Sequence, residues 1–148
     1  MGVNLSDNFT LAELTHSQAA DRLGLPNVPG PAELAALRRT AHGLEWVRAL
    51  VGKPITISSG YRSTLVNKAV GGKPASQHTR GEAADITCPA LDPARLMAAI
   101  VRAPGAAYDQ CILEFYKPGA GGWVHISFTD APRRQALVID AAGARPYA

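Results

Sequence analysis

Hydrophobic residues in the first half of the chain recur at helical spacing. Residues 31–52 place leucines and alanines three or four positions apart, begin with Pro31 and end at Gly52, which predicts a long amphipathic helix. Another helix is predicted to begin after Thr10, which can act as the N-cap and form a capping box with Glu13. Besides residues 31–52, the predicted helices span residues 10–24, 63–72 and 92–103.

Short β-branched or alternating runs predict strands, and most of them lie in the second half of the chain. The predicted strands are residues 54–58, 83–87, 110–116, 123–128 and 135–140. A Gly- and Pro-rich stretch, residues 117–122, separates two of them and predicts a hairpin loop. Helices followed by neighbouring strands favour an α+β fold, with a small antiparallel sheet flanked by helices. A chain of 148 residues is expected to form one domain, residues 1–148.

The hairpin pattern also predicts which residues face each other. With residues 117–122 as the loop, Glu114 pairs with His125 on one face of the sheet. The other face is apolar and predicted to be the core face, with Leu113, Phe115, Val124, Ile126 and Phe128. Alternation along residues 83–87 allows Asp85 to lie on the polar face beside Glu114 and His125. A register shift of one residue would bury these polar side chains, so the pattern supports the pairing.

Charge and composition exclude some classes of function. A formal net charge of +3 is spread along the chain, and the densest basic runs are only Arg38–Arg39 and Arg133–Arg134. With 2 Trp, 4 Tyr and 3 Phe there are few aromatics to interleave with them, so no nucleic-acid partner is expected. No apolar run reaches transmembrane length, and the N-terminus lacks the pattern of a secretory signal. We therefore expect a protein that is made in the cytoplasm and has no membrane partner, and we expect it to be a monomer.

The 2 cysteines, Cys88 and Cys111, are too few for a disulfide framework. Neither belongs to a Cys-x-x-Cys pair, which argues against a zinc-thiolate or redox site. Both are predicted to be small buried hydrophobic residues.

The stretch SQHTRGEAADIT, residues 76–87, contains candidate metal ligands. His78 and Asp85, together with His125, would offer two neutral imidazoles and one carboxylate. This ligand set suits zinc and leaves a fourth position open for water, as in catalytic rather than structural sites. An isolated histidine is more often a solvated side chain, which is what we expect of His16 and His42.

The stretch SQHTRGEAAD resembles the Ser-x-His-x-x-Gly-x-Ala-x-Asp pattern of the zinc D-Ala-D-Ala carboxypeptidases and peptidoglycan endopeptidases, a group that includes Hedgehog-like domains. The matching positions are Ser76, His78, Gly81, Ala83 and Asp85. The similarity extends to ISSGYRSTLVNKAVGG and DQCILEFYKPGAGGWVHISF, and the flanks look like those of small phage and prophage members. The resemblance implies Zn²⁺ bound by His78, Asp85 and His125, with peptidoglycan as the partner.

One position departs from the pattern of many relatives, which carry a catalytic acid as Glu-x-x-His before the last zinc ligand. Here that position is Gly122, so the general base must come from elsewhere. Glu114 is the candidate that the hairpin places beside His125. Asp109, at the far end of the same strand, is the second candidate.

Arg62, in SGYRS after a predicted strand, matches the position that stabilises the oxyanion in the family. Its planar fork of donors suits an oxyanion or a substrate carboxylate, whereas without the resemblance it would be taken as a surface arginine. Tyr61, Ser76 and Gln77 are expected to line the site or to orient the ligands.

Two hypotheses follow from these residues. The first is a zinc peptidase that cleaves stem-peptide or cross-bridge bonds of peptidoglycan, and the second is a non-catalytic phage or wall-binding domain of the same fold. Within the first, the sequence shows no separate wall-binding domain and no secretion signal, which is typical of a single-domain endolysin released during phage lysis. This favours an endopeptidase over a D-Ala-D-Ala carboxypeptidase.

Overall fold

The computed structural model describes residues 2–148, and its longest helix is α3 (Pro31–Val51). As predicted, α3 begins at a proline and ends at Gly52, which adopts the left-handed conformation with φ of 65°. Its buried side chains recur three or four positions apart, from Ala36 to Val47, and pack onto the rest of the core. The other helices are α1 (Leu11–Thr15), α2 (Gln18–Leu23), α4 (Thr64–Ala69), α5 (Pro93–Arg102) and the 3₁₀ helix η1 (Gln77–Arg80).

The single helix predicted over residues 10–24 is wrong, because the chain forms α1 and α2 with a break at His16. The start is as predicted: Thr10 caps α1 and Glu13 completes the capping box. The break is stabilised on both sides. The Asn27 amide donates to the Thr15 carbonyl over 2.7 Å, and the Ser17 hydroxyl accepts from a backbone N–H of α2. The new N-cap at Ser17 and the hydrogen bond to the Thr15 carbonyl compensate for the helical hydrogen bonds that are lost at the break.

Six strands form one sheet in the order β1-β2-β4-β3-β5-β6. Their bounds are β1 (Thr56–Ser59), β2 (Ala83–Thr87), β3 (Gln110–Lys117), β4 (Gly121–Ser127), β5 (Gln135–Asp140) and β6 (Gly143–Pro146). The α+β prediction is confirmed, but the sheet is not wholly antiparallel, because β5 pairs with β3 in parallel. Strand β6 was not predicted, since its four residues are exposed and none is β-branched.

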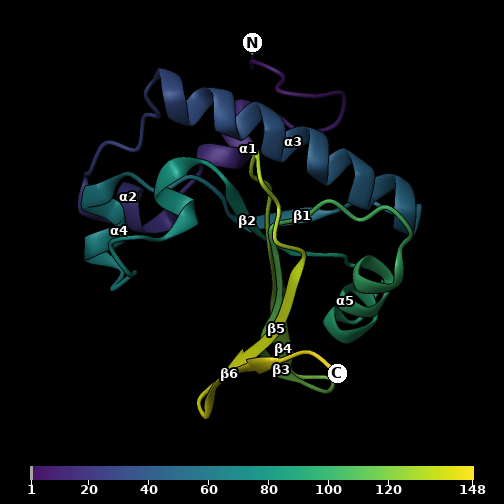
Figure 1. The fold of residues 1–148 in the computed structure, drawn as a ribbon. Coiled ribbons are helices and arrows are strands. Elements are labelled where there is room, and N and C mark those ends of the chain that lie inside the picture. The colour runs from purple at the N-terminus through teal and green to yellow at the C-terminus, as the bar shows by residue number, and fades with distance from the viewer. Residues whose placement is uncertain (1) are drawn as a thin grey trace.

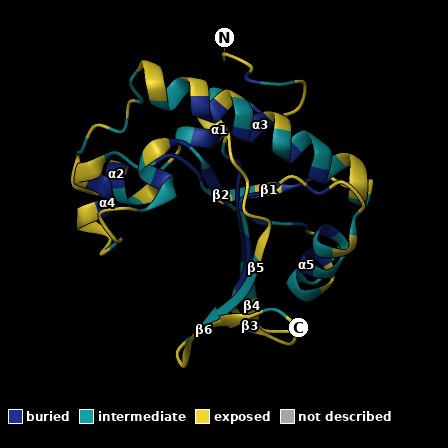
Figure 2. Cartoon of the chain, in the orientation of Figure 1, coloured by how far each residue is buried: buried dark blue, intermediate teal, exposed yellow. Residues whose placement is uncertain are grey.

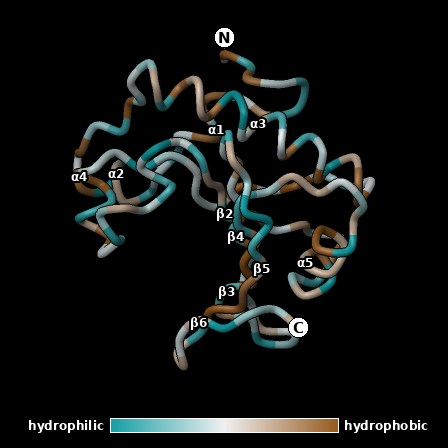
Figure 3. Tube along the Cα trace, in the orientation of Figure 1, coloured by the Kyte–Doolittle hydropathy of each residue, from teal (hydrophilic) through white to brown (hydrophobic). Residues whose placement is uncertain are grey.

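Helices cover the two faces of the sheet unequally. Figure 1 shows α5 and α4 on opposite sides of the sheet, which is seen nearly edge-on. The α5 side is the core face, where Ala84, Ile86, Val124 and Ile126 are fully buried. Buried residues accordingly gather in the middle of the sheet in Figure 2, and Figure 3 shows hydrophobic residues along the strands and in α5. The opposite face is left open below α4.

The β3–β4 hairpin is shifted by two residues from the predicted register. Glu114 pairs with Trp123 rather than with His125, and His125 pairs with Ile112. A bulge between Glu114 and Lys117 takes up the extra residues. Because side chains alternate with a period of two, a shift of two leaves the residues outside the bulge on their predicted faces. Glu114 and His125 therefore still share the open face.

The bulge moves Phe115 out of the core, so this part of the predicted core face is wrong. Phe115 has a φ of 50° and is 47% exposed, and its ring packs beside Trp123 with the ring centroids 5.6 Å apart. Tyr116 packs against the core instead, and its hydroxyl donates to Asp92 over 2.8 Å.

Cys88 and Cys111 are free and buried, as predicted. No helix within residues 2–148 has both the length and the apolar character needed to cross a membrane. His16 and His42 are exposed, as expected.

Candidate metal centre

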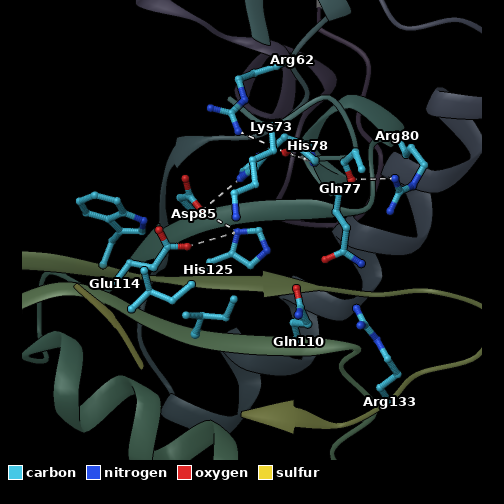
Figure 4. A pocket seen from close by; sticks show the side chains of 15 residues that line it. Arg62, Lys73, Gln77, His78, Arg80, Asp85, Gln110, Glu114, His125 and Arg133 are labelled. Atoms are coloured by element: carbon cyan, nitrogen blue, oxygen red, sulfur yellow. Dashed lines mark hydrogen bonds and ion pairs between the residues drawn. The ribbon is translucent and has the colours of Figure 1, made fainter. Parts of the chain in front are cut away.

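Three candidate ligands converge at the open face of the sheet (Figure 4). Asp85 on β2 and His125 on β4 are direct partners in the antiparallel ladder, and His78 comes from η1. Asp85 Oδ1 lies 3.1 Å from His125 Nδ1 and 3.3 Å from His78 Nε2. The ligand atoms of all three residues lie within 4.8 Å of one another. The structure thus brings together the residues that the motif predicted as ligands.

The turn that carries His78 is fixed to α3. The Ser76 hydroxyl accepts from the His78 backbone N–H and caps η1, and Gly81 ends η1 with a φ of 74°. Gly81 lies so close to α3 that a Cβ there would be 2.5 Å from the Glu33 carbonyl oxygen. The Thr40 hydroxyl donates to the Gly81 carbonyl over 2.7 Å. A side chain at position 81 would push this turn off the helix, which explains the glycine in the motif.

The tautomer of His78 is set by its surroundings. Its Nδ1 lies 2.7 Å from the carbonyl oxygen of Gly60, which can only accept, so Nδ1 carries the proton. The lone pair is then on Nε2, the atom that faces Asp85. A backbone carbonyl behind a histidine is a common way of orienting a metal ligand.

The charge of Asp85 also suits a ligand. Burial alone would raise the pKa of Asp85, but the adjacent imidazole groups of His125 and His78 outweigh burial and hold the pKa well below its usual range. Asp85 is therefore an anion at neutral pH. A tetrahedral zinc ion with bonds of about 2.0–2.1 Å needs ligand atoms roughly 3.3 Å apart. The two Asp85 distances match this spacing, so the residues present fit zinc.

Glu114 lies beside the three ligands. Its Oε1 is 3.8 Å from His125 Nδ1, and its side chain is 19% exposed. Burial, followed by the negative charge of Asp85, raises the pKa of Glu114, while His125, Arg62 and Trp123 act in the opposite direction. A carboxylate that lines the cavity beside the three candidate ligands is placed for proton transfer.

Gly122, where many relatives carry the acid, has no room for a side chain. Its φ is 100°, and a Cβ would lie 2.5 Å from the Cα of Tyr116. The close approach results from the bulge opposite. A glutamate at this position is therefore incompatible with this hairpin, and within the described residues Glu114 is the carboxylate that lines the cavity besides Asp85.

Asp109, the second candidate base, is already paired with Arg133 and Gln77. It is 2% exposed and accepts hydrogen bonds from Arg133 Nε, Arg133 Nη2 and Gln77 Nε2 at 2.9, 2.7 and 2.8 Å. The hydrogen bonds from Arg133 lower the pKa of Asp109 to about 2 against the opposing effect of burial. A saturated carboxylate of such low basicity outside the cavity lining is a poor general base.

Arg62 is half-buried above the ligands in Figure 4. Its backbone N–H donates to the His78 carbonyl, and its Nη2 lies 3.4 Å from the Ser76 hydroxyl. Burial lowers the pKa of Arg62, and the negative charges of Asp85 and Glu114 act against that. A guanidinium group is charged in any case and brings positive charge to the site.

The remaining predicted site residues divide into two groups. Ser76 and Gln77 line the cavity, whereas Tyr61 is 7% exposed and its side chain belongs to the hydrophobic core. The cavity has a volume of about 500 Å³. Sequence reasoning missed several of its other lining residues, which are Lys73, Arg80, Gln110, Trp123 and Arg133. Of these, only Arg133 gave any signal, as part of a basic pair.

A group of three residues that fits zinc on a sheet face, with a carboxylate and an arginine beside it, is typical of the metallohydrolase class. Residues 7–127 match the sequence model of the Peptidase M15 family. The chain belongs to that family, which confirms the resemblance carried by the SQHTRGEAAD motif.

A relative with a described activity is the "Zinc D-Ala-D-Ala carboxypeptidase" of Streptomyces albus G. The two sequences are 37% identical over 84 residues. This match covers 53% of the present chain but 31% of the relative, so less than a third of that protein is matched.

Proposed function

We propose that the protein is a zinc peptidase that hydrolyses peptide bonds of peptidoglycan. The observation that carries the proposal is the convergence of His78 Nε2, Asp85 Oδ1 and His125 Nδ1 beside the Glu114 carboxylate. Membership of the Peptidase M15 family and the name of the Streptomyces relative support it.

Each side chain then has a role that follows from its position. A zinc ion held by the three ligands would act as a Lewis acid and make water reactive near neutral pH. Glu114 Oε1 accepts a proton from the attacking water and returns it to the nitrogen of the leaving amine. Arg62 stabilises the negative charge that develops on the carbonyl oxygen. His78 is held in the required tautomer by the Gly60 carbonyl.

We propose that the bond that is cleaved lies inside the stem peptide or the cross-bridge, as in an endolysin-type endopeptidase. Lys73, Ala75 and Arg80 on the lining of the cavity are all exposed, so the cavity is open to solvent on that side. A longer chain or a cross-bridge can therefore enter. The alternative, removal of a terminal D-Ala, is supported by the name of the Streptomyces relative. In either case we propose that the protein acts on the cell wall, and that it is released from the cytoplasm during phage lysis.

The proposal is tested on purified peptidoglycan. Zinc-loaded protein should release new amino groups, the chelator-treated protein should not, and added zinc should restore the release. Mass analysis of the products distinguishes loss of a terminal D-Ala from cleavage of a cross-link. Zinc-loaded protein that sediments with peptidoglycan but releases no amino groups would favour a non-catalytic wall-binding domain.

A further inference from the structure

The cavity has a cationic end that the proposed chemistry does not use. Arg133, Lys73 and Arg80 all line it. Figure 4 shows Arg133 and Glu114 on opposite sides of His125. An anionic group of a substrate that lies on the side of His125 away from Glu114 would therefore meet the positive charge of Arg133.

Arg133 is held in a fixed position. Its backbone N–H, Nε and Nη2 all donate to Asp109, a carboxylate that is 2% exposed. Gln77, the neighbour of the ligand His78, donates to the same carboxylate. The network thus ties Arg133 to the metal centre through Asp109 and Gln77. The Arg133 side chain is 57% exposed, and its Nη1 makes no hydrogen bond to any residue in the range 2–148.

One further lining residue carries a buried polar atom without a hydrogen bond in the described chain, the amide oxygen of Gln77. Buried polar atoms are normally satisfied, so an unpaired one in a cavity points to a ligand that completes it. The N–H of a peptide backbone is such a partner. Gln77 is bonded to Asp109, the carboxylate that also holds Arg133.

We propose that Arg133 forms a carboxylate-binding subsite, and that the substrate is a peptide carrying a carboxylate on the side of the metal centre away from Glu114. The peptide donates a backbone N–H to the amide oxygen of Gln77, and Nη1 of Arg133 donates to the carboxylate of the peptide. Lys73 adds positive charge, since no carboxylate within residues 2–148 lies within 4.0 Å of its amine. The inference deepens the proposed function and rests on it for the nature of the substrate as a peptide.

A carboxylate on such a peptide has two sources, the C-terminus and an internal acidic residue. Both are tested by calorimetric binding to the zinc-loaded Glu114→Gln protein, so that no cleavage is needed. The probes are a stem pentapeptide ending in D-Ala-D-Ala, the same peptide amidated at the C-terminus, and the same peptide amidated at its internal carboxylate. One of the two amidations should weaken binding by about tenfold or more, because a charged hydrogen-bonded pair is lost. The sensitive position identifies the source.

Arg133→Gln in this background should bind all three peptides equally and weakly. Because this change leaves the Asp109 carboxylate buried without its partner, Asp109→Asn/Arg133→Gln serves as the second variant and should give the same result. Arg145→Gln is the matched control, since Arg145 pairs with Asp140 outside the cavity. It should leave the discrimination unchanged.

Equal binding of the three peptides by the protein with Arg133 intact would overturn the inference. Discrimination that persists in both Arg133 variants would overturn it as well. Cleavage of peptidoglycan by the wild type is a separate measurement. If the wild type cleaves peptidoglycan but the three peptides bind equally, the carboxylate subsite alone is refuted. If the peptides bind with different affinities but the wild type never cleaves peptidoglycan, the proposed function alone is refuted.

Discussion

Asp85 and His125 face each other directly across the β2–β4 ladder, with Oδ1 and Nδ1 3.1 Å apart. A backbone pairing thus sets the spacing of two ligand atoms, and only His78 has to be brought in from a turn. Sites built on strands are held more precisely than sites on loops. We therefore expect the ligand geometry to be largely preformed.

The first prediction is one zinc ion per chain, bound by these three residues. His125→Ala should lose the bound metal, because two ligands remain, and chelation of the wild type should lower the midpoint of thermal unfolding. At a zinc concentration of 100 times Kd, binding stabilises the folded state by about 2.7 kcal/mol. Elemental analysis of protein purified without added metal gives the content. His42→Ala, at an exposed position on α3, is the control and should keep its zinc. Full zinc content in His125→Ala would exclude this residue as a ligand.

The convergence of His78, Asp85 and His125 could be predicted from sequence because the placement of these side chains depends on local rules. The motif sets the turn at His78, and strand alternation sets the face of Asp85. Glu114 reached the correct face even though its predicted partner was wrong, since an error of two residues does not change the face. The bulge at Phe115 could not be predicted, because it depends on tertiary packing rather than on any turn residue.

The Asp109–Arg133 pair could not be predicted from the sequence for a different reason. The two residues are brought together by the parallel pairing of β3 with β5, two strands that are separated in the chain by β4. Local patterns carry no information on such a pairing. The same reason explains why the cationic end of the cavity was not foreseen.

The second prediction concerns Gly122. Gly122→Ala should destabilise the fold by roughly 2–4 kcal/mol, because a Cβ would be strained at a φ of 100° and would also meet Tyr116 at 2.5 Å. Gly119→Ala in the same loop is a matched control, with a φ of 70° and open space around a Cβ. It should cost only about 1 kcal/mol from backbone strain. Urea unfolding of both variants gives the difference, and equal losses would show that the contact with Tyr116 does not matter.

The third prediction is that Asp109 makes the stability of the protein sensitive to acid. Its pKa in the folded state is about 2, and that of an aspartate in an unfolded chain is about 3.9. The unfolded state therefore binds more protons between these values, so the stabilisation is complete above pH 4 and is lost as the pH falls through 2. We expect roughly 1–2 kcal/mol at neutral pH, with about half of it gone at pH 3. Urea unfolding at pH 6 and pH 3 should show the wild type losing more stability than Asp109→Asn. An equal loss in the two proteins would contradict the prediction.

The fourth prediction is that Arg62→Lys lowers activity by roughly a hundredfold or more while zinc content and folding stay near normal. An ammonium group keeps the charge but cannot replace the planar fork at a developing oxyanion. Release of amino groups from peptidoglycan is compared at equal zinc occupancy. Arg80→Lys, at an exposed position on the same cavity, is the control and should retain most activity. An active Arg62→Lys protein would assign this arginine a structural role.

The last prediction is that Glu114 is the general base, although its strand partner is Trp123 and not His125. The 3.8 Å approach to His125 Nδ1 brings its carboxylate within reach of a water at the metal centre, and Gly122 has no room for an alternative. Glu114→Gln keeps the size and polarity of the side chain but cannot accept a proton. We expect it to retain fold and zinc and to lose activity by roughly 10²–10⁴-fold, the usual weight of general acid–base catalysis.

Asp109→Asn is the comparison that decides between the two carboxylates. Because Asp109 is saturated by Arg133 and Gln77, its replacement should reduce stability and leave the proton transfer itself intact. At a temperature where all three proteins are folded and zinc-loaded, the rate should fall steeply in Glu114→Gln and much less in Asp109→Asn. The reverse order would assign the base to Asp109. A wild-type rate in both variants would mean that neither carboxylate transfers the proton.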